Sequence, residues 1–259
     1  MQMLITVALE YQLSGTAPVL LTLEAAQTDG QTLVESALKI DNATLHRISG
    51  EFGLGQRVWA TISGDRLAVD YTAKVTVTRP HCAVETLAAA PVHVLPIDAL
   101  TCLRPSRFCP SDLFTDFVGQ RFGHLNGGEK VAAIVDWVKA ETQYVPGSSD
   151  ARTTAVDTFV SRQGVCRDFA HLACSLVRAA SMPARYVSVY CADARPPDFH
   201  AATQVWLDGA WHLFDATGMG EPSGLVIIGA GRDAADVSFL ETSQWAQMIA
   251  QTVTVSRSR

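Results

Sequence analysis

The dipeptide Asp208-Gly209 constrains the fold of this chain more than any other feature of its sequence. It separates two apolar segments, residues 200–207 and 211–217, and favours a two-residue turn because both central positions need a positive φ. The two segments are therefore predicted to form an antiparallel hairpin of fixed register. In that register His200 and Asp215 point to the same face as diagonal neighbours, about 7–8 Å apart at the backbone. The hairpin thus predicts a histidine–aspartate pair.

The same register places Trp206 opposite Trp211. We interpret the two rings as a structural cross-strand pair, with the wall of a substrate subsite as the alternative. A further strand is predicted at residues 184–192, because this segment is rich in aromatic and β-branched residues. These segments provide the strands of a predicted antiparallel sheet.

A helix that carries a cysteine is predicted directly after Gly164. Its apolar side chains recur at helical spacing until Met182-Pro183, where proline ends the helix. Cys166 lies in the first turn, where free backbone N–H groups and the positive end of the helix dipole favour a thiolate. It lies about 50° from the centre of the apolar stripe, at the edge of the buried face. The stripe consists of Phe169, Leu172, Ala173, Leu176, Val177 and Ala180.

Cysteine, histidine and aspartate side chains can together form a site for nucleophilic catalysis. A free thiol has a pKa of about 8.5 and is mostly protonated at neutral pH. A neighbouring imidazole takes the proton, and a carboxylate orients the imidazole. The sequence therefore predicts a catalytic triad of Cys166, His200 and Asp215.

Several motifs occur in the order found in a known family. The chain resembles the bacterial transglutaminase-like family, which is described as cysteine proteases of the papain-like superfamily. The resemblance extends over roughly residues 96–240. The motifs are GVCRDFAHL at 164–172, MPARYV at 182–187, DFHA at 198–201 and WHLFDAT at 211–217, with the segments 103–108 and 231–237.

The resemblance implies an α+β fold. In the papain/transglutaminase-like catalytic core the helix bearing the cysteine packs on an antiparallel sheet, and an antiparallel β-sandwich-like domain precedes this core. By resemblance, Cys166 is the nucleophile, His200 the base and Asp215 the orienting carboxylate. The family commonly reads His-Ala-Trp followed by a Glu-Val strand, whereas this chain continues from His200 with Ala-Ala-Thr-Gln-Val. This departure from the family sequence affects the expected substrate pocket and leaves the three triad residues unchanged.

Residues 1–95 differ in sequence pattern from the rest of the chain. Short strand-like segments separated by turn residues are typical of an antiparallel sandwich. Pro91, Pro96 and Pro105 mark a connector, so we divide the chain into a β-rich N-terminal domain, 1–95, and a transglutaminase-like catalytic domain, 96–259. The predicted strands are 4–9, 20–25, 33–40, 57–62, 66–69 and 72–78, and further helices are expected at 111–122 and 128–142.

Composition limits the partners of the protein. The chain has 259 residues, a net charge of −6 and no basic run, so we expect neither nucleic-acid binding nor membrane association. The N-terminus lacks the basic region of a signal peptide, and no segment is long and apolar enough to span a membrane. The six cysteines indicate reduced thiols and hence a cytoplasmic location. No cofactor is expected.

Three further residues are candidates for the surroundings of the thiol. The backbone N–H of Cys166 is the natural first donor to an oxyanion, and Gln163 is a candidate second donor that the derived geometry does not demand. Asp168 and His171 would line the entrance, although Asp168 is equally well explained as a charge at the helix start. As metal ligands, Cys166, His171 and Cys174 would project in different directions, so no metal site is predicted.

The expected reaction is acyl transfer on a peptide or protein substrate through a thioester. Water as acceptor gives peptide or amide hydrolysis, which we favour, and an amine gives transglutamination. The alternative is a non-catalytic protein-binding module on a degenerate transglutaminase-like fold, motivated by the altered residues after His200. Whether the chain forms a homo-oligomer is left open.

Overall fold

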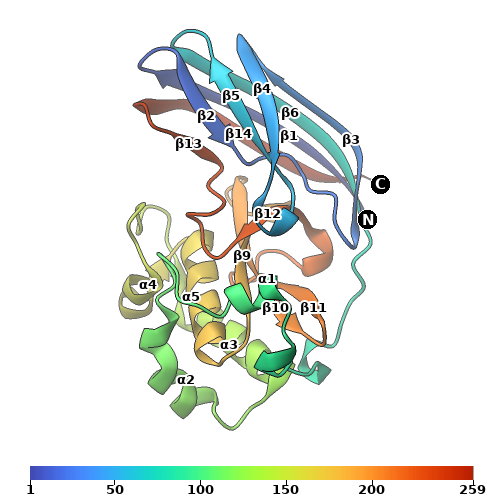
Figure 1. Ribbon diagram of the computed structural model, residues 1–259, viewed down its shortest axis with the longest axis vertical. Helices are drawn as coiled ribbons and strands as arrows, with labels where there is room; N and C mark the ends of the chain where they lie inside the picture. The colour runs from blue at the N-terminus through green and yellow to red at the C-terminus, as the bar shows by residue number, and fades with distance from the viewer. Residues whose placement is uncertain (259) are drawn as a thin grey trace.

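The computed structural model describes residues 1–258, in which a β-sandwich sits on a mixed α/β core (Figure 1). The sandwich consists of two antiparallel four-stranded sheets. The first has the order β14-β1-β6-β3, with the bounds Ala246–Ser258, Gln2–Leu13, Arg66–Val77 and Gln31–Ile40. The second has the order β13-β2-β5-β4, with the bounds Leu240–Thr242, Ala17–Leu21, Gln56–Ile62 and Ala43–Ser49.

Alternation of side chains explains why these segments form a sandwich. In β1 every second side chain from Met3 to Leu13 is buried, and the residues between them are exposed or half-buried. Successive side chains of a strand point to opposite faces, so each sheet has one apolar face that packs on the other sheet. The predicted antiparallel sandwich is confirmed. However, residues 66–69 and 72–78 belong to the single strand β6, and β4 has no counterpart among the predicted strands.

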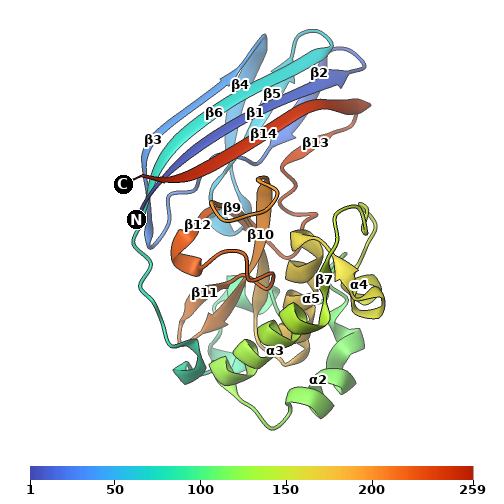
Figure 2. The ribbon, with the colours of Figure 1, turned by 180° about the vertical axis from the view of Figure 1, so that it is seen from behind.

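The C-terminal strands belong to the sandwich. β14 pairs with β1 along its whole length, from Gln2 opposite Ser258 to Leu13 opposite Ala246 (Figure 2). β13 likewise extends the second sheet. The assignment of residues 240–258 to the predicted domain 96–259 is therefore wrong, because a strand pairing over more than two hundred residues leaves no local signal in the sequence. The division near residue 95 stays a prediction.

The core consists of a central helix on an antiparallel sheet, as predicted. The sheet has the order β11-β10-β9-β12, with the bounds Ala210–Phe214, Phe199–Leu207, Ala184–Cys191 and Leu225–Gly231. The helices are α1 (Ile97–Thr101), α2 (Thr115–Phe122), α3 (Gly127–Glu141), α4 (Ala155–Ser161) and the central α5 (Cys166–Ala179). Among residues 1–258 no helix is both long and apolar enough to cross a bilayer.

The central helix α5 is enclosed more fully than its apolar stripe predicts. Every residue from Asp168 to Arg178 is buried, including polar ones. The sheet covers one side of α5, and α3, α4 and the connector before α2 cover the others (Figure 1). The first turn, which carries Cys166, and the last residue, Ala179, are half-buried. The fold thus holds the thiol in the partly accessible first turn of a helix whose middle is fully buried.

The hairpin has the register that its turn predicts. Trp206 lies opposite Trp211, and Asp208 and Gly209 have φ values of 50° and 81°. The two indole rings meet edge to face, with centroids 5.3 Å apart. Asp215 directly follows the last residue of β11, so the turn carries the aspartate to the level of the histidine on β10.

The sandwich and the core share apolar packing. Val226 and Ile228 of β12 and Tyr190 of β9 belong to the same hydrophobic cluster as the inner faces of the sandwich. The Tyr190 hydroxyl also donates a hydrogen bond to the carbonyl of Leu23, at 2.6 Å. The sandwich is therefore packed directly against the sheet of the core.

Candidate active site

The structure brings Cys166, His200 and Asp215 together. Nε2 of His200 lies 2.9 Å from Oδ2 of Asp215, and both side chains are almost fully buried. Cys166 lies close enough to His200 to contribute to the raised pKa of its imidazole. Because Nε2 faces the aspartate, Nδ1 is the ring nitrogen available to the sulfur. Three side chains spread over fifty positions of the sequence thus gather at one place. Of the three, only Cys166 is partly exposed to solvent.

The carboxylate of Asp215 is held from several sides. Its Oδ1 accepts hydrogen bonds from the backbone N–H and the hydroxyl of Thr217, at 2.9 and 2.7 Å. Its Oδ2 accepts a further bond from the Gly220 N–H at 2.9 Å. Burial alone would raise the pKa of Asp215, but the bonds from His200, Thr217 and Gly220 outweigh it and lower the pKa. Asp215 is therefore an ionised, fixed partner for the imidazole.

The imidazole of His200 is cationic at neutral pH. Burial favours the neutral ring, yet Asp215 and Cys166 outweigh it and raise the pKa of His200 to about 10. A protonated ring beside the sulfur is the condition in which a thiolate persists. The arrangement therefore supplies a nucleophile and, on the adjacent ring, a proton for a leaving group.

Tyr144 is a member of this group that the sequence analysis missed. Its hydroxyl lies near Cys166, which contributes to the shift of the Tyr144 pKa. Desolvation and the negative charge of Cys166 raise the pKa of Tyr144 to about 12, so the hydroxyl keeps its proton. The group next to the sulfur is therefore a tyrosine hydroxyl.

A two-residue parallel ladder places Tyr144. Strands β7 (Gln143–Tyr144) and β8 (Gln163–Gly164) pair so that Tyr144 lies opposite Gly164, two residues before the cysteine. The N–H of Val145 also donates to the Gly164 carbonyl at 2.9 Å. A ladder this short has no recognisable pattern.

Asp168 secures the start of the catalytic helix. Its side chain is buried, and Oδ2 accepts a hydrogen bond from the Val165 N–H at 2.8 Å. The Ser149 hydroxyl also donates to this oxygen, which ties the loop before α4 to the helix. A side chain at Gly164 would place its Cβ 2.7 Å from the Asp168 Cβ, so this approach requires glycine. These contacts agree with the interpretation of Asp168 as an acidic residue that stabilises the start of the helix.

Gln163 lies at the surface and His171 lies in the core. Gln163 is exposed, and its backbone bonds to Ser161. His171 is completely buried, with its ring stacked on Phe108 and its Nε2 accepting a hydrogen bond from the Ala234 N–H. Desolvation lowers the pKa of His171 to about 3 and keeps the ring neutral. The expectation that His171 lines an entrance is wrong, because its place on α5 turns it into the core.

The residues that depart from the family pattern after His200 are also buried. Ala202 and Thr203 are at most 1 % exposed, and the Thr203 hydroxyl donates to the Ala170 carbonyl of α5. Gln204 accepts a hydrogen bond from Nε of Arg185 at 2.9 Å. These side chains pack inside the core, so the departure changes packing around the helix rather than an exposed substrate surface.

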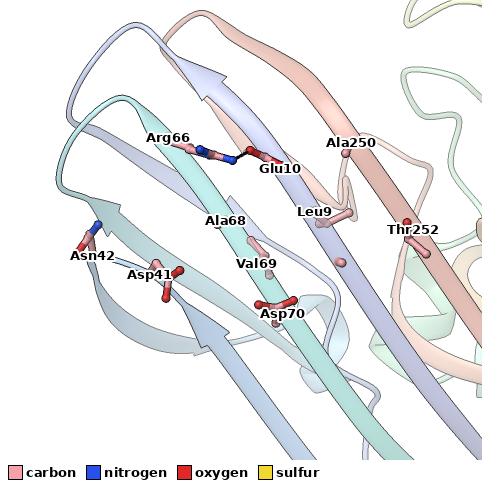
Figure 3. A pocket seen from close by; sticks show the side chains of 11 residues that line it. Leu9, Glu10, Asp41, Asn42, Arg66, Ala68, Val69, Asp70, Ala250 and Thr252 are labelled. Atoms are coloured by element: carbon pink, nitrogen blue, oxygen red, sulfur yellow. Dashed lines mark hydrogen bonds and ion pairs between the residues drawn. The ribbon is translucent and has the colours of Figure 1, made fainter.

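The site has no metal-binding cluster within residues 1–258. No group of three or more histidine, cysteine or acidic side chains is arranged there to hold a metal ion. A shallow hollow of about 420 Å³ lies on the sandwich instead (Figure 3). Its lining includes Glu10, which is paired with Arg66, and the carboxylates of Asp41 and Asp70. Its lining residues come from β1, β6, β14 and the turn between β3 and β4, and none comes from α5.

The fold of this chain is shared with known proteins. Residues 118–216 match the family model described as the transglutaminase-like superfamily. The crystal structure of a "putative cysteine protease" from Cytophaga hutchinsonii is 32 % identical and has a TM-score of 0.90 to this chain. The match covers 99 % of this chain and 90 % of that one.

Two curated mycobacterial proteins are also similar. The uncharacterized protein ML0607 of Mycobacterium leprae is 29 % identical over 148 residues, which are 54 % of this chain and 53 % of that protein. The uncharacterized protein Rv2569c of Mycobacterium tuberculosis is 33 % identical over 125 residues, which are 42 % and 40 % of the two chains. The matched segments thus span about half or less of these relatives.

Proposed function

Since the chain belongs to the transglutaminase-like superfamily, we propose that it is a cysteine-dependent enzyme that transfers the acyl group of a carboxamide through a thioester. The hydrogen bond between His200 and Asp215, with Cys166 close enough to help raise the pKa of the ring, is the observation that supports this proposal. The substrate is a peptide bond or a glutamine side chain of a peptide or protein.

The first half of the reaction forms the thioester. The sulfur of Cys166 attacks the carboxamide carbon, a C–S bond forms, and the π electrons move to oxygen. His200 then gives its proton to the departing amine or ammonia as the C–N bond breaks. Asp215 keeps the imidazole oriented and stabilises its cation. The proton is already on His200 before the substrate arrives, because the pKa of the ring is raised.

The second half consumes the thioester. The now neutral His200 takes a proton from the incoming nucleophile, whose oxygen or nitrogen bonds to the carbonyl carbon while the C–S bond breaks. Water gives hydrolysis, which we favour, and an amine gives transglutamination. In both cases the sulfur leaves as thiolate and His200 is again protonated, so the cycle closes.

We assign Tyr144 as the second donor to the oxyanion. Its hydroxyl lies near Cys166, at whose backbone N–H the tetrahedral oxygen is expected to form. There the tyrosine hydroxyl can donate to the oxygen alongside the Cys166 N–H. The raised pKa of Tyr144 keeps the proton available for this bond.

The alternative of a non-catalytic binding module loses its motivation. It rested on the changed residues after His200, and Ala202 and Thr203 are buried in packing. We also propose a cytoplasmic location, since all six cysteines, which lie within residues 1–258, are free thiols.

Selective alkylation tests the proposed nucleophile. At mildly acidic pH, iodoacetamide is expected to label the native protein at Cys166 and to leave the Cys166→Ala variant unlabelled. Cys82→Ala removes the other partly exposed cysteine and serves as the matched control, which should label like the native protein. The proposal fails if the native protein is not labelled at Cys166 or if selective labelling persists in Cys166→Ala.

A further inference from the structure

The nucleophile borders an apolar surface that the mechanism does not use. The Cys166 side chain packs against a small hydrophobic cluster, and Ala234, in the segment after β12, packs against the same cluster. Both residues are half-buried, whereas the members of the cluster are buried. These members are Ala170 of α5, Tyr186 of β9, Ala201 of β10 and Val237. Ala234 is therefore an accessible apolar residue next to the surroundings of the thiol.

The spacing of residues along α5 places this surface beside the nucleophile. Ala170 follows Cys166 by four residues, so the two side chains lie on the same face of the helix. The next residue, His171, accepts a hydrogen bond from the Ala234 N–H at 3.1 Å. The segment that carries Ala234 therefore meets the catalytic helix about one turn beyond the thiol.

Buried side chains hold that segment in place. The ring of His171 is completely buried and lies 5.2 Å, between centroids, from each of the rings of Phe108 and Tyr186. The carboxylate of Asp233 is also buried. Its Oδ2 accepts a hydrogen bond from the Phe108 N–H and its Oδ1 one from the Ala235 N–H, both at 2.9 Å. A surface that selects substrates by their shape has to be rigid, and these contacts make this one rigid.

The acyl group needs room beside the sulfur once the thioester has formed. In the proposed reaction the oxyanion takes the backbone N–H of Cys166, and the leaving group takes the proton of His200. The substituent of the acyl carbon is then left with the side on which the apolar cluster and Ala234 lie. A methyl group offers no hydrogen bond, so it can favour this substituent only by apolar contact.

We propose that Ala234 is a specificity-determining residue, whose methyl group contacts the acyl chain of the thioester and makes the enzyme prefer an aliphatic chain of limited bulk. The inference rests on the proposed function and names the class of acyl group that the site accepts. A charged group in the same place would lose hydration without gaining a partner. Asp236, an acid of the same segment, is already paired with Arg232 at 2.9 Å.

Activated esters test this inference without a known peptide substrate. The thiolate attacks the ester carbonyl, the C–S bond forms, the C–O bond breaks and p-nitrophenolate leaves, so the burst of p-nitrophenolate measures acylation. The probes are benzyloxycarbonyl amino acid p-nitrophenyl esters of glycine, norleucine, lysine and tert-leucine. Lysine replaces the terminal methyl of norleucine by an ammonium group, and tert-leucine adds bulk next to the carbonyl. The native enzyme should react roughly tenfold faster with norleucine than with lysine.

Variants of the segment then assign the preference to Ala234. Ala234→Leu fills the space beside the thiol, so the ratio of the tert-leucine rate to the glycine rate should fall by at least roughly tenfold. Ala235→Leu is the matched control, because Ala235 is also half-buried but lies outside the cluster, and the ratio should stay unchanged. If Ala234→Leu does not fold, Ala234→Gly serves instead, and the ratio should rise by about threefold while the norleucine preference decreases.

The outcomes separate the two proposals. Equal rates for norleucine and lysine in the native enzyme overturn this inference alone. So does Ala234→Leu if it slows the glycine and tert-leucine esters by the same factor, or if Ala235→Leu changes their ratio as much. Absence of acylation by every ester, together with no selective labelling of Cys166, overturns the proposed function and this inference with it.

Discussion

The sandwich and the core of this protein are stabilised in different ways. Among residues 1–258 the sandwich buries three polar or charged side chains, Thr22, Glu24 and Gln31, whereas the core buries fourteen. Ion pairs of the sandwich, such as Arg66 with Glu10, lie on its outside. In the core, by contrast, Arg178, His200 and Asp215 are inside. A buried polar group is tolerated only when its hydrogen bonds are made. Single substitutions should therefore cost much more in the core.

The largest effect is expected at the aspartate of the core. Asp215→Asn removes the charge that orients and stabilises the His200 cation, so kcat/KM should fall by about 10³–10⁴-fold. Because the pKa of His200 is raised to about 10, kcat/KM of the native enzyme should decline near pH 10, where the ring loses its proton. Without the carboxylate the pKa of His200 falls, so this decline should move to lower pH.

The measurement is kcat/KM against pH for both proteins. Asp70→Asn, which alters an exposed acid of the sandwich, is the matched control and should behave like the native enzyme. A decrease of less than tenfold for Asp215→Asn would contradict the account.

The next largest effect is expected on stability. The buried guanidinium of Arg178 donates to the Ala184 carbonyl at 2.9 Å, to the Ser106 hydroxyl at 3.1 Å and to the carbonyls of Arg104 and Arg232. Arg178→Met leaves these acceptors unpaired, so the free energy of unfolding should fall by about 3–5 kcal/mol. Urea unfolding followed by circular dichroism measures it, and a loss below about 1 kcal/mol would remove the contrast between the regions.

A smaller effect is expected for the tyrosine of the site. Tyr144→Phe removes one oxyanion donor and keeps the ring beside Phe169, so kcat should fall by about 10²-fold while thiol labelling persists. The comparison is Tyr71→Phe in the sandwich, where the hydroxyl accepts a hydrogen bond from the backbone N–H of Ala25. That variant should lose about 1 kcal/mol of stability and no activity. Equal activity of Tyr144→Phe and native enzyme would exclude the assigned role.

The smallest effect is expected on the surface of the sandwich. The Arg66 side chain is 64 % exposed and pairs with Glu10 in the hollow of Figure 3. Arg66→Met should change the free energy of unfolding by less than about 1 kcal/mol, since exposed ion pairs contribute little. The same urea titration measures it. A change as large as that of Arg178→Met would mean that the two regions do not differ in the way described.

Local patterns predicted most of the sandwich and the framework of the site. Alternation identified β1, and Asp208-Gly209 set the register that brings His200 to Asp215. These signals are local, because each depends on side chains within about a dozen residues of one another. The placement of Cys166 in the first helical turn follows from the same kind of signal.

Pairings between distant segments could not be predicted. β14 joins β1 across almost the whole chain, and the β7–β8 ladder that places Tyr144 is two residues long. His171 was misjudged because an apolar stripe indicates one buried face, whereas α5 is enclosed on all sides. In each case the decisive contact is made by the tertiary fold and not by the segment itself.

The protonation state of His200 tests the central claim most directly. Nitrogen NMR of the labelled protein, with His200→Gln to assign the resonance, can follow the ring from about pH 5 to about pH 11. The account predicts a cationic ring at neutral pH that loses its proton near pH 10, and an earlier loss in Cys166→Ala and Asp215→Asn. A ring that titrates near its ordinary value of about 6.5 in the native protein would contradict it.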